Sequence, residues 1–195
     1  GGGSNLVANL RLVHVSSGGL WYPAEYTSFN VDISGDGTIR TNSFNPQKSV
    51  APGASTGVLT ITPHKYYGDL TMYATTVYEW EGISPLDCDR IDVPEDVSAL
   101  DGTLLVLDGG GLVGGDYVII RYATQDVNGS MDDLTPTLTA DVSGLPAGWA
   151  GEIIVDEDAK EIILRLTEPI SAIPEPVGLG LIGFALLGLR RRKRN

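Results

Sequence analysis

Apolar and polar residues alternate in short runs along most of the chain, and turn-forming residues separate these runs. The first run places Leu6, Ala8, Leu10 and Leu12 at every second position. This period predicts a half-buried strand that reaches Val15, with the leucines on its buried face. Runs of the same kind predict further short strands at residues 29–33, 38–41, 58–61, 76–80, 89–93, 102–107, 117–122, 152–155 and 162–166.

Two of the intervening turns carry a clear chemical signal. Residues 34–37 read Ser-Gly-Asp-Gly, and Asp-Gly readily supplies the positive φ of a tight turn. We therefore expect the strands on either side, 29–33 and 38–41, to pair as a hairpin. Residues 156–159 read Asp-Glu-Asp-Ala between two apolar runs, which predicts the solvated loop of a second hairpin. The body is thus expected to be all-β, with no helix longer than about ten residues before Pro174.

The last two dozen residues have a different pattern. Pro174-Glu175-Pro176 fixes φ twice and removes two backbone donors, so neither a helix nor a sheet runs through it. Residues 177–189 are apolar and uncharged, and they predict a buried or membrane helix because they show no polar face. A block of cations follows at once, consisting of Arg190, Arg191, Arg192, Lys193 and Arg194. An apolar helix followed by Lys and Arg is typical of a membrane segment whose C-terminus stays in the cytoplasm.

The apolar stretch is short for a permanent membrane span. Counted from Ile173 to Leu189 and at roughly 1.5 Å per residue, it covers about 25 Å, against roughly 30 Å of hydrocarbon. Arginine side chains can reach the interface and the bilayer can thin, each at a modest cost. We therefore expect a single C-terminal transmembrane helix.

The charge divides at the same place. The formal net charge is −12, from 13 Lys and Arg residues and 25 acids. Five of the cations and none of the acids lie in residues 190–194, so the body carries −17 and the tail +5. An acidic body has no electrostatic reason to bind nucleic acid, whereas it suits a surface protein that attracts Ca²⁺. Cys88 is the single cysteine, so the fold does not depend on an internal disulfide.

The first residues read Gly-Gly-Gly-Ser and lack the basic and apolar regions of a signal peptide. Either a signal has been removed or the chain is the C-terminal piece of a longer protein. We favour the second interpretation, because Leu6 already begins a strand-like alternation.

The ordered C-terminus resembles the PEP-CTERM sorting signal of Gram-negative bacteria, a signature also found on some proteins labelled ice-binding. The likeness covers residues 173–195. It implies export, transient anchoring in the inner membrane and processing by an exosortase, a membrane-embedded cysteine transpeptidase, before the protein reaches the cell surface or the extracellular space. In this resemblance the recognition residues are Pro174, Glu175 and Pro176. The membrane-retention residues are Arg190, Arg191, Arg192, Lys193 and Arg194.

A second likeness covers residues 49–166. In order, this region contains Pro-Gly-x-Ser-x-Gly-x-Leu-Thr, Asp-Arg-Ile-Asp-Val, Gly-Thr-Leu, Tyr-x-Ile-Ile and Leu-Pro-x-Gly-Trp. The series resembles the C-terminal part of autotransporter-associated β-strand repeat proteins, which are right-handed β-helical passengers. It implies a parallel β-solenoid or its capping end. A β-sandwich of about ten short strands fits the turn spacing nearly as well, so both architectures stay open.

Candidate reactive residues are few. His14 and His64 are far apart in the sequence and have no metal-ligand spacing. Cys88 lies between Asp87 and Asp89, and flanking carboxylates raise the pKa of a thiol, which disfavours a nucleophilic role. The remaining acids cluster in turns without the spacing of a calcium loop, and no spacing identifies a catalytic carboxylate pair. We therefore predict no catalytic residue, no metal ligand and no cofactor.

These observations predict a β-rich extracytoplasmic domain at residues 1–166, a linker at 167–173 and the sorting signal at 174–195. The expected function is that of an exported, non-catalytic cell-surface or extracellular-matrix protein that an exosortase sorts. Its expected partners are the exosortase, inner-membrane lipid and a surface polysaccharide, and not nucleic acid. The alternative is the C-terminal end of a larger secreted adhesin or carbohydrate-active enzyme whose functional region lies upstream.

Overall fold

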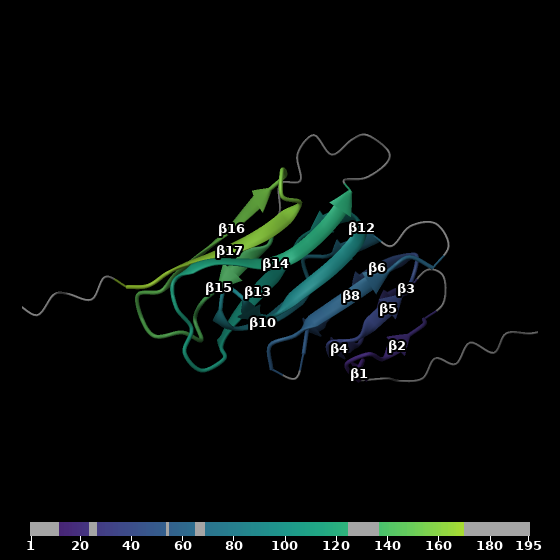
Figure 1. Cartoon of the computed structure of the whole chain (residues 1–195), viewed down its shortest axis with the longest axis horizontal. Coiled ribbons are helices and arrows are strands. Elements are labelled where there is room, and N and C mark those ends of the chain that lie inside the picture. Colours follow the sequence, from purple (N-terminus) through teal and green to yellow (C-terminus); the bar gives the residue numbers. More distant parts are fainter. Residues whose placement is uncertain (1–11, 24–26, 54, 65–68, 125–136, 170–195) are drawn as a thin grey trace, which may run out of the picture.

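The computed structural model describes residues 12–23, 27–53, 55–64, 69–124 and 137–169. Within these ranges the chain forms seventeen strands and no helix, so the all-β expectation is confirmed (Figure 1). Nothing in the described part of the chain has the length and apolarity of a membrane-crossing helix. The predicted transmembrane helix lies outside these ranges, as does the part of the first predicted strand that precedes Leu12.

The strands make two sheets, and nearly all of them pair in parallel. The seven-stranded sheet contains, in spatial order, β1 (Leu12–His14), β4 (Asp32–Ser34), β7 (Ser49–Ala51), β10 (Val77–Ser84), β13 (Thr103–Asp108) and β15 (Thr139–Asp141), with β11 (Asp87–Cys88) paired antiparallel to β10.

The ten-stranded sheet has two limbs that share one strand. The long limb contains, in spatial order, β2 (Leu20–Trp21), β5 (Thr38–Arg40), β8 (Val58–Thr62), β12 (Arg90–Leu100), β14 (Gly115–Thr124), β17 (Glu161–Thr167) and β16 (Ala150–Asp156). The short limb contains β3 (Thr27–Phe29), β6 (Ser43–Pro46) and β9 (Asp69–Met72), and it joins the second half of β12.

From β1 to β9 the chain winds so that each turn adds one strand to each of three rows of strands. For example, β4, β5 and β6 form one turn, and β7, β8 and β9 pair with them in parallel in the next turn. Figure 1 shows these turns stacked in sequence order, from the purple N-terminal strands to the green C-terminal ones. Parallel pairing of this kind differs from the antiparallel pairing of a β-sandwich. The body is therefore all-β and is built of largely parallel sheets.

The hairpin predicted around residues 34–37 does not form. β4 pairs with β1 and β7, whereas β5 pairs with β2 and β8, so the two strands lie in different sheets. The glycines of this turn instead let one corner of the coil rest on the corner before it. Gly35 adopts φ 115°, and a Cβ there would lie 2.0 Å from the carbonyl oxygen of Val15. The positive φ of an Asp-Gly turn suits a hairpin and such a corner equally, which is why the sequence pattern was misleading.

The expected burial of the first strand is also wrong at its described end. Leu12 is 55% exposed, and Val15 is buried instead. The cause is the register of β1 against β4, in which Val13 pairs with the buried Ile33. Because side chains alternate along a strand, Leu12 and His14 must then face outward.

Side chains at the same height in successive turns stack into ladders that fill the interior. Each ladder is continuous because the parallel registers carry one inward position directly onto the next. The ladder on the seven-stranded sheet consists of Val13, Ile33, Val50, Tyr78, Leu104 and Ala140. The ladder on the long limb consists of Leu59, Ile91, Ile120, Ile162 and Val155. Their central members are fully buried, and each such side chain contributes roughly 1.5–3 kcal/mol through removal from water.

An antiparallel hairpin closes the C-terminal end of the stack. β16 and β17 pair along their whole length, as the Asp-Glu-Asp-Ala loop predicted. β17 also pairs antiparallel with β14, so the hairpin extends the long limb beyond the last parallel strand. The parallel register therefore ends at β14 in this limb.

The stacked corners give a first prediction. Gly102 has φ 106°, and a Cβ there would lie 2.3 Å from the carbonyl oxygen of Thr76 in the preceding turn. Gly102→Ala should therefore lower the free energy of unfolding by roughly 1–3 kcal/mol, measured by urea denaturation. Gly144→Ala is the control, since its nearest neighbour, the Val106 carbonyl oxygen, lies at 3.4 Å. Equal stability of the two variants would contradict the role of Gly102 in corner stacking.

Candidate functional site

The residues assigned to sorting, Pro174 to Pro176 and Arg190 to Arg194, lie outside the described residues. The described body ends with β17 at Thr167, followed by Glu168 and Pro169. The strongest candidate within the described body is the outward side of the long limb, where charged side chains from four strands lie in register. We call this surface the charged face.

The charged face has two polar rows with an apolar row between them. The first row consists of Thr60, Asp92, Arg121, Glu161 and Asp156, which are cross-strand neighbours in that order. The middle row consists of Val118, Ile163 and Ile154. The third row consists of Asp116, Arg165 and Glu152.

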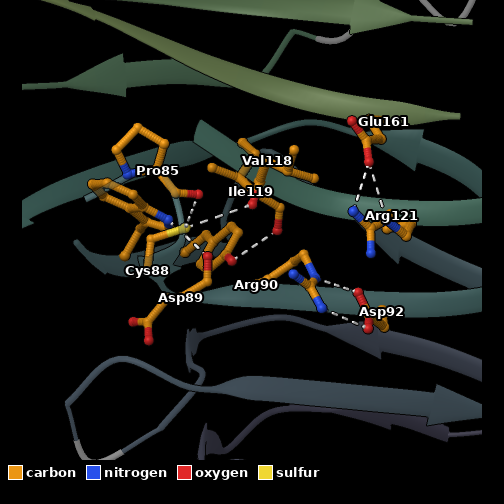
Figure 2. A network of polar contacts seen from close by, with 11 residues as sticks. Pro85, Cys88, Asp89, Arg90, Asp92, Val118, Ile119, Arg121 and Glu161 are labelled. Atoms are coloured by element: carbon orange, nitrogen blue, oxygen red, sulfur yellow. Dashed lines mark hydrogen bonds and ion pairs between the residues drawn. The ribbon is translucent and has the colours of Figure 1, made fainter. Parts of the chain in front are cut away.

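A β-bulge in β14 sets the position of Arg121. The register between β14 and β17 shifts between Val118 and Ile120, so Ile119 and Ile120 both point into the core. Val118 and Arg121 therefore both face outward, as Figure 2 shows. The carbonyl oxygen of Ile119 accepts a hydrogen bond of 3.0 Å from the hydroxyl of Tyr78, which is fully buried.

Each arginine of the charged face is held by a carboxylate. Two nitrogens of Arg121 donate to one oxygen of Glu161, at 3.0 and 2.7 Å (Figure 2). Arg165 makes two parallel bonds to Asp116, at 2.7 and 2.8 Å. The hydrogen bonds from Arg165 lower the pKa of the Asp116 carboxyl, so this pair stays ionised at neutral pH.

Arg90 completes this set by pairing with Asp92 on its own strand. Its two bonds measure 2.6 and 3.1 Å. The hydrogen bond to Asp92 is the main cause that raises the pKa of Arg90. All three arginines are thus matched by acids, and the face offers a patterned polar surface rather than a block of one charge.

Arg121 lines two of the hollows that open on the charged face. The first has a volume of about 300 Å³ and is lined by Thr56, Gly57, Val58, Pro85, Leu86, Asp87, Cys88, Arg90, Val118 and Arg121. The second has a volume of about 320 Å³ and is lined by Thr60, Asp92, Val93, Pro94, Arg121, Tyr122 and Ala123. Leu86 is 99% exposed at the rim of the first hollow.

Cys88 lies in the first hollow but is not activated there. Its sulfur is 3.9 Å from the carbonyl oxygen of Val118 (Figure 2). Burial raises the pKa of the Cys88 thiol to about 11, Arg90 opposes this rise, and Asp89 and Asp87 add to it. The predicted direction is confirmed, although burial is the larger cause. At neutral pH the thiol keeps its proton and is a weak nucleophile.

Asp89 joins two turns of the coil. It is 3% exposed, and its two carboxylate oxygens accept backbone N–H bonds from Gly57 at 2.8 Å and from Glu81 at 3.0 Å. Its backbone carbonyl accepts the indole N–H of the buried Trp80 at 2.8 Å. Burial raises the pKa of the Asp89 carboxyl to about 7, against the lowering effect of the two N–H donors. The Asp89 side chain therefore has a structural role, because each of its oxygens accepts a backbone N–H bond.

The two histidines have separate partners. His14 Nδ1 lies 3.0 Å from the hydroxyl of Ser34 on the neighbouring strand. The His64 ring packs edge-on against Tyr22, with ring centroids 4.7 Å apart, and its Nδ1 lies 2.8 Å from the Tyr22 hydroxyl. Each contact links different turns of the coil.

The acid clusters are also used locally. Asp32 accepts a bond from the Ser49 hydroxyl at 3.0 Å, and Asp156 accepts one from the Ala159 amide at 2.8 Å within the hairpin loop. Among the residues that the structure describes, no group of three or more His, Cys, Asp or Glu side chains could hold a metal ion.

Comparisons with known proteins found no match, whether to protein-family models, to curated proteins or to solved structures.

Sequence reasoning missed the ion pairs that organise the charged face. Arg121 and Glu161 are 40 residues apart in the sequence, and Asp116 and Arg165 are 49 apart, so only the register of β14 against β17 brings them together. The alternation of Asp116 with Val118, and of Glu161 with Ile163 and Arg165, was the available signal. It identifies outward positions but not their partners.

Asp89 gives a second prediction, on pH. Its folded pKa of about 7 lies above the ordinary value for an aspartate, so the folded state binds this proton more tightly than the unfolded state does. Stability from Asp89 is therefore fully present below about pH 4 and is lost as the pH rises through about 7. The melting temperature of the wild type should fall between pH 5 and pH 8, and Asp89→Asn should flatten this dependence.

The control is Asp158→Asn, which removes one exposed acid from the hairpin loop. It should keep the pH dependence of the wild type. Because the Asp89→Asn change also removes a backbone bond, the slopes of melting temperature against pH are compared rather than the absolute values. Identical slopes in wild type and Asp89→Asn would contradict the assignment.

Proposed function

We propose that this chain is an exported, non-catalytic cell-surface or extracellular-matrix protein that an exosortase of a Gram-negative bacterium sorts through residues 174–195. The observation that carries the proposal is that the last strand of the body, β17, ends at Thr167, shortly before Pro174. Residues 168–173 span at most about 20 Å when extended. The strands of the described body thus end before the signal begins, which supports a Pro-Glu-Pro at the outer membrane interface with the body folded outside.

The charge division supports the same orientation. The five cations from Arg190 to Arg194 follow the apolar stretch, and the acidic body precedes it. Moving cations into hydrocarbon costs roughly 2.5–3.5 kcal/mol each on insertion scales. Anionic inner-leaflet lipid favours cations on the cytoplasmic side by about 1 kcal/mol each. The basic tail is then the retention signal, in contact with inner-membrane lipid, until the exosortase acts.

The architecture supports a surface role for the body. Its stacked parallel turns support a parallel β-solenoid with a capping end, the architecture implied by the likeness to autotransporter-associated β-strand repeats. A solenoid presents long lateral surfaces on a rigid frame. The charged face is one such surface, and its paired arginines, its hollows and the protonated Cys88 suit contact with a surface polysaccharide better than covalent chemistry.

Two variants test the sorting signal in a host that contains the exosortase. Glu175→Ala removes the charge between the two prolines, and we expect the protein to remain uncleaved in the inner membrane. Replacement of the five tail cations by Gln removes the retention signal, and we expect lost orientation or release of the uncleaved chain. The measurements are membrane fractionation and the mass of the mature C-terminus.

Glu157→Ala is the matched control, because it removes one exposed acid from the hairpin loop of the body. It should be processed like the wild type. Normal processing of Glu175→Ala and of the Gln-tail variant together would refute the proposed sorting.

A further inference from the structure

The end of the long limb presents a strand whose outer edge has no partner within the described residues. β16 is the last strand in the spatial order of this limb, and its described pairing is with β17 alone. In Figure 1 it lies at the outer margin of the sheet, beyond β17. Its seven residues read Ala-Gly-Glu-Ile-Ile-Val-Asp. The neighbouring terminal strand of the other sheet, β15, has three residues and offers far less edge.

This edge lacks most of the devices that prevent strand addition. β16 contains no proline and no lysine, and its register with β17 runs without a bulge from Ala150 to Asp156. None of its residues is buried, and the apolar Ile153, Ile154 and Val155 are all partly exposed. An added strand would pair the open backbone groups and cover apolar surface on both sides of the sheet.

The acidic residues of β16 give its edge some protection against strand addition. Glu152 and Asp156 lie on the same outward side, with Ile154 between them. A second copy of β16, added antiparallel, would bring Glu152 opposite or diagonal to the same two acids of the other copy. Like charges across strands are destabilising, so this edge disfavours self-association.

The rows of the charged face define the strand that would fit. In the third row the signs alternate from Asp116 to Arg165 to Glu152, and the first row ends in Asp156. Glu152 already contributes to the raised pKa of Arg165. A further strand that continues the rows has a cation beside each of Glu152 and Asp156 and an apolar residue beside Ile154.

We infer that the open edge of β16 is a docking site for an extended segment of a partner protein with the pattern cation-x-apolar-x-cation, which adds to the long limb as a further strand. Backbone hydrogen bonds along the edge supply the affinity, and the two cations that face Glu152 and Asp156 set the register and the specificity. The inference rests on the described body alone and does not depend on the sorting signal.

The test uses the full-length chain and a labelled, end-blocked peptide, Thr-Lys-Val-Ile-Val-Lys-Thr. Binding is followed by fluorescence anisotropy, and amide hydrogen exchange of β16 is measured with and without the peptide. We expect saturable binding and slower exchange of the β16 amides. Two control peptides should bind at least about tenfold more weakly: Thr-Glu-Val-Ile-Val-Glu-Thr, which reverses the charges, and Lys-Lys-Thr-Val-Ile-Val-Thr, which has the same composition in the wrong order.

Two protein variants separate strand addition from general attraction to an acidic body. Glu152→Lys should weaken binding of the lysine peptide roughly fivefold, because one cross-strand attraction becomes a repulsion. Asp36→Lys makes the same change of charge at the exposed corner between β4 and β5, near the opposite end of the long limb, and should leave the affinity within about twofold, since a charge more than a Debye length from the contact is screened.

Three outcomes would overturn the inference. Equal weakening by both variants would mean that net charge alone attracts the peptide. Binding without added protection of the β16 amides would place the peptide elsewhere. Concentration-dependent protection of β16 in the protein alone, with dimers in sedimentation velocity, would make a second copy the occupant.

Discussion

In-register parallel pairing is the constraint on which the rest of this structure depends. Each turn of the chain is too small to enclose a core of its own, and its inward side chains become buried only when the next turn repeats their positions. The ladder from Val13 to Ala140 shows this over six strands. The same constraint acts outside, where it brings Thr60, Asp92 and Arg121 into one row. The strand register therefore determines both the packing of the core and the arrangement of the charged face.

The local periodicity of the sequence predicted most of the longer strands, but it missed short ones such as β2, β6, β7 and β15, and it did not identify which strands pair. The strands at 152–155 and 162–166 were predicted together with their hairpin, because a short polar loop joins two neighbouring apolar runs. The turn at residues 34–37 gave a similar signal and yet forms a corner between two sheets. What distinguishes them is the fit of Gly35 onto Val15 of the preceding turn, which is a contact between distant segments. A single sequence contains no direct record of such a contact.

The candidate site was predictable to a smaller degree. The acidic neighbours of Cys88 predicted the direction in which the pKa of its thiol shifts. The main cause of that shift is burial beneath the β10–β11 turn and β14, which depends on the fold. Asp89 looked like one acid of a cluster, and its two backbone bonds to different turns became visible only with the coil assembled. Arg121 could be recognised as outward-facing only after the bulge at Ile119 was known. The features that define the charged face arise from contacts between successive turns of the chain. Sequence patterns describe only residues within one turn.

The order of the last strands has a consequence for how the body reaches its final state. β16 precedes β17 in the chain, yet β17 is the strand that pairs with β14 and holds β16 in place. A chain that emerges from a ribosome or a secretion channel N-terminus first can stack its parallel turns progressively. It cannot close the end of the stack until Thr167 is free. Closure of the body is therefore timed by β17, the last strand of the described residues, and it follows the stacking of the parallel turns.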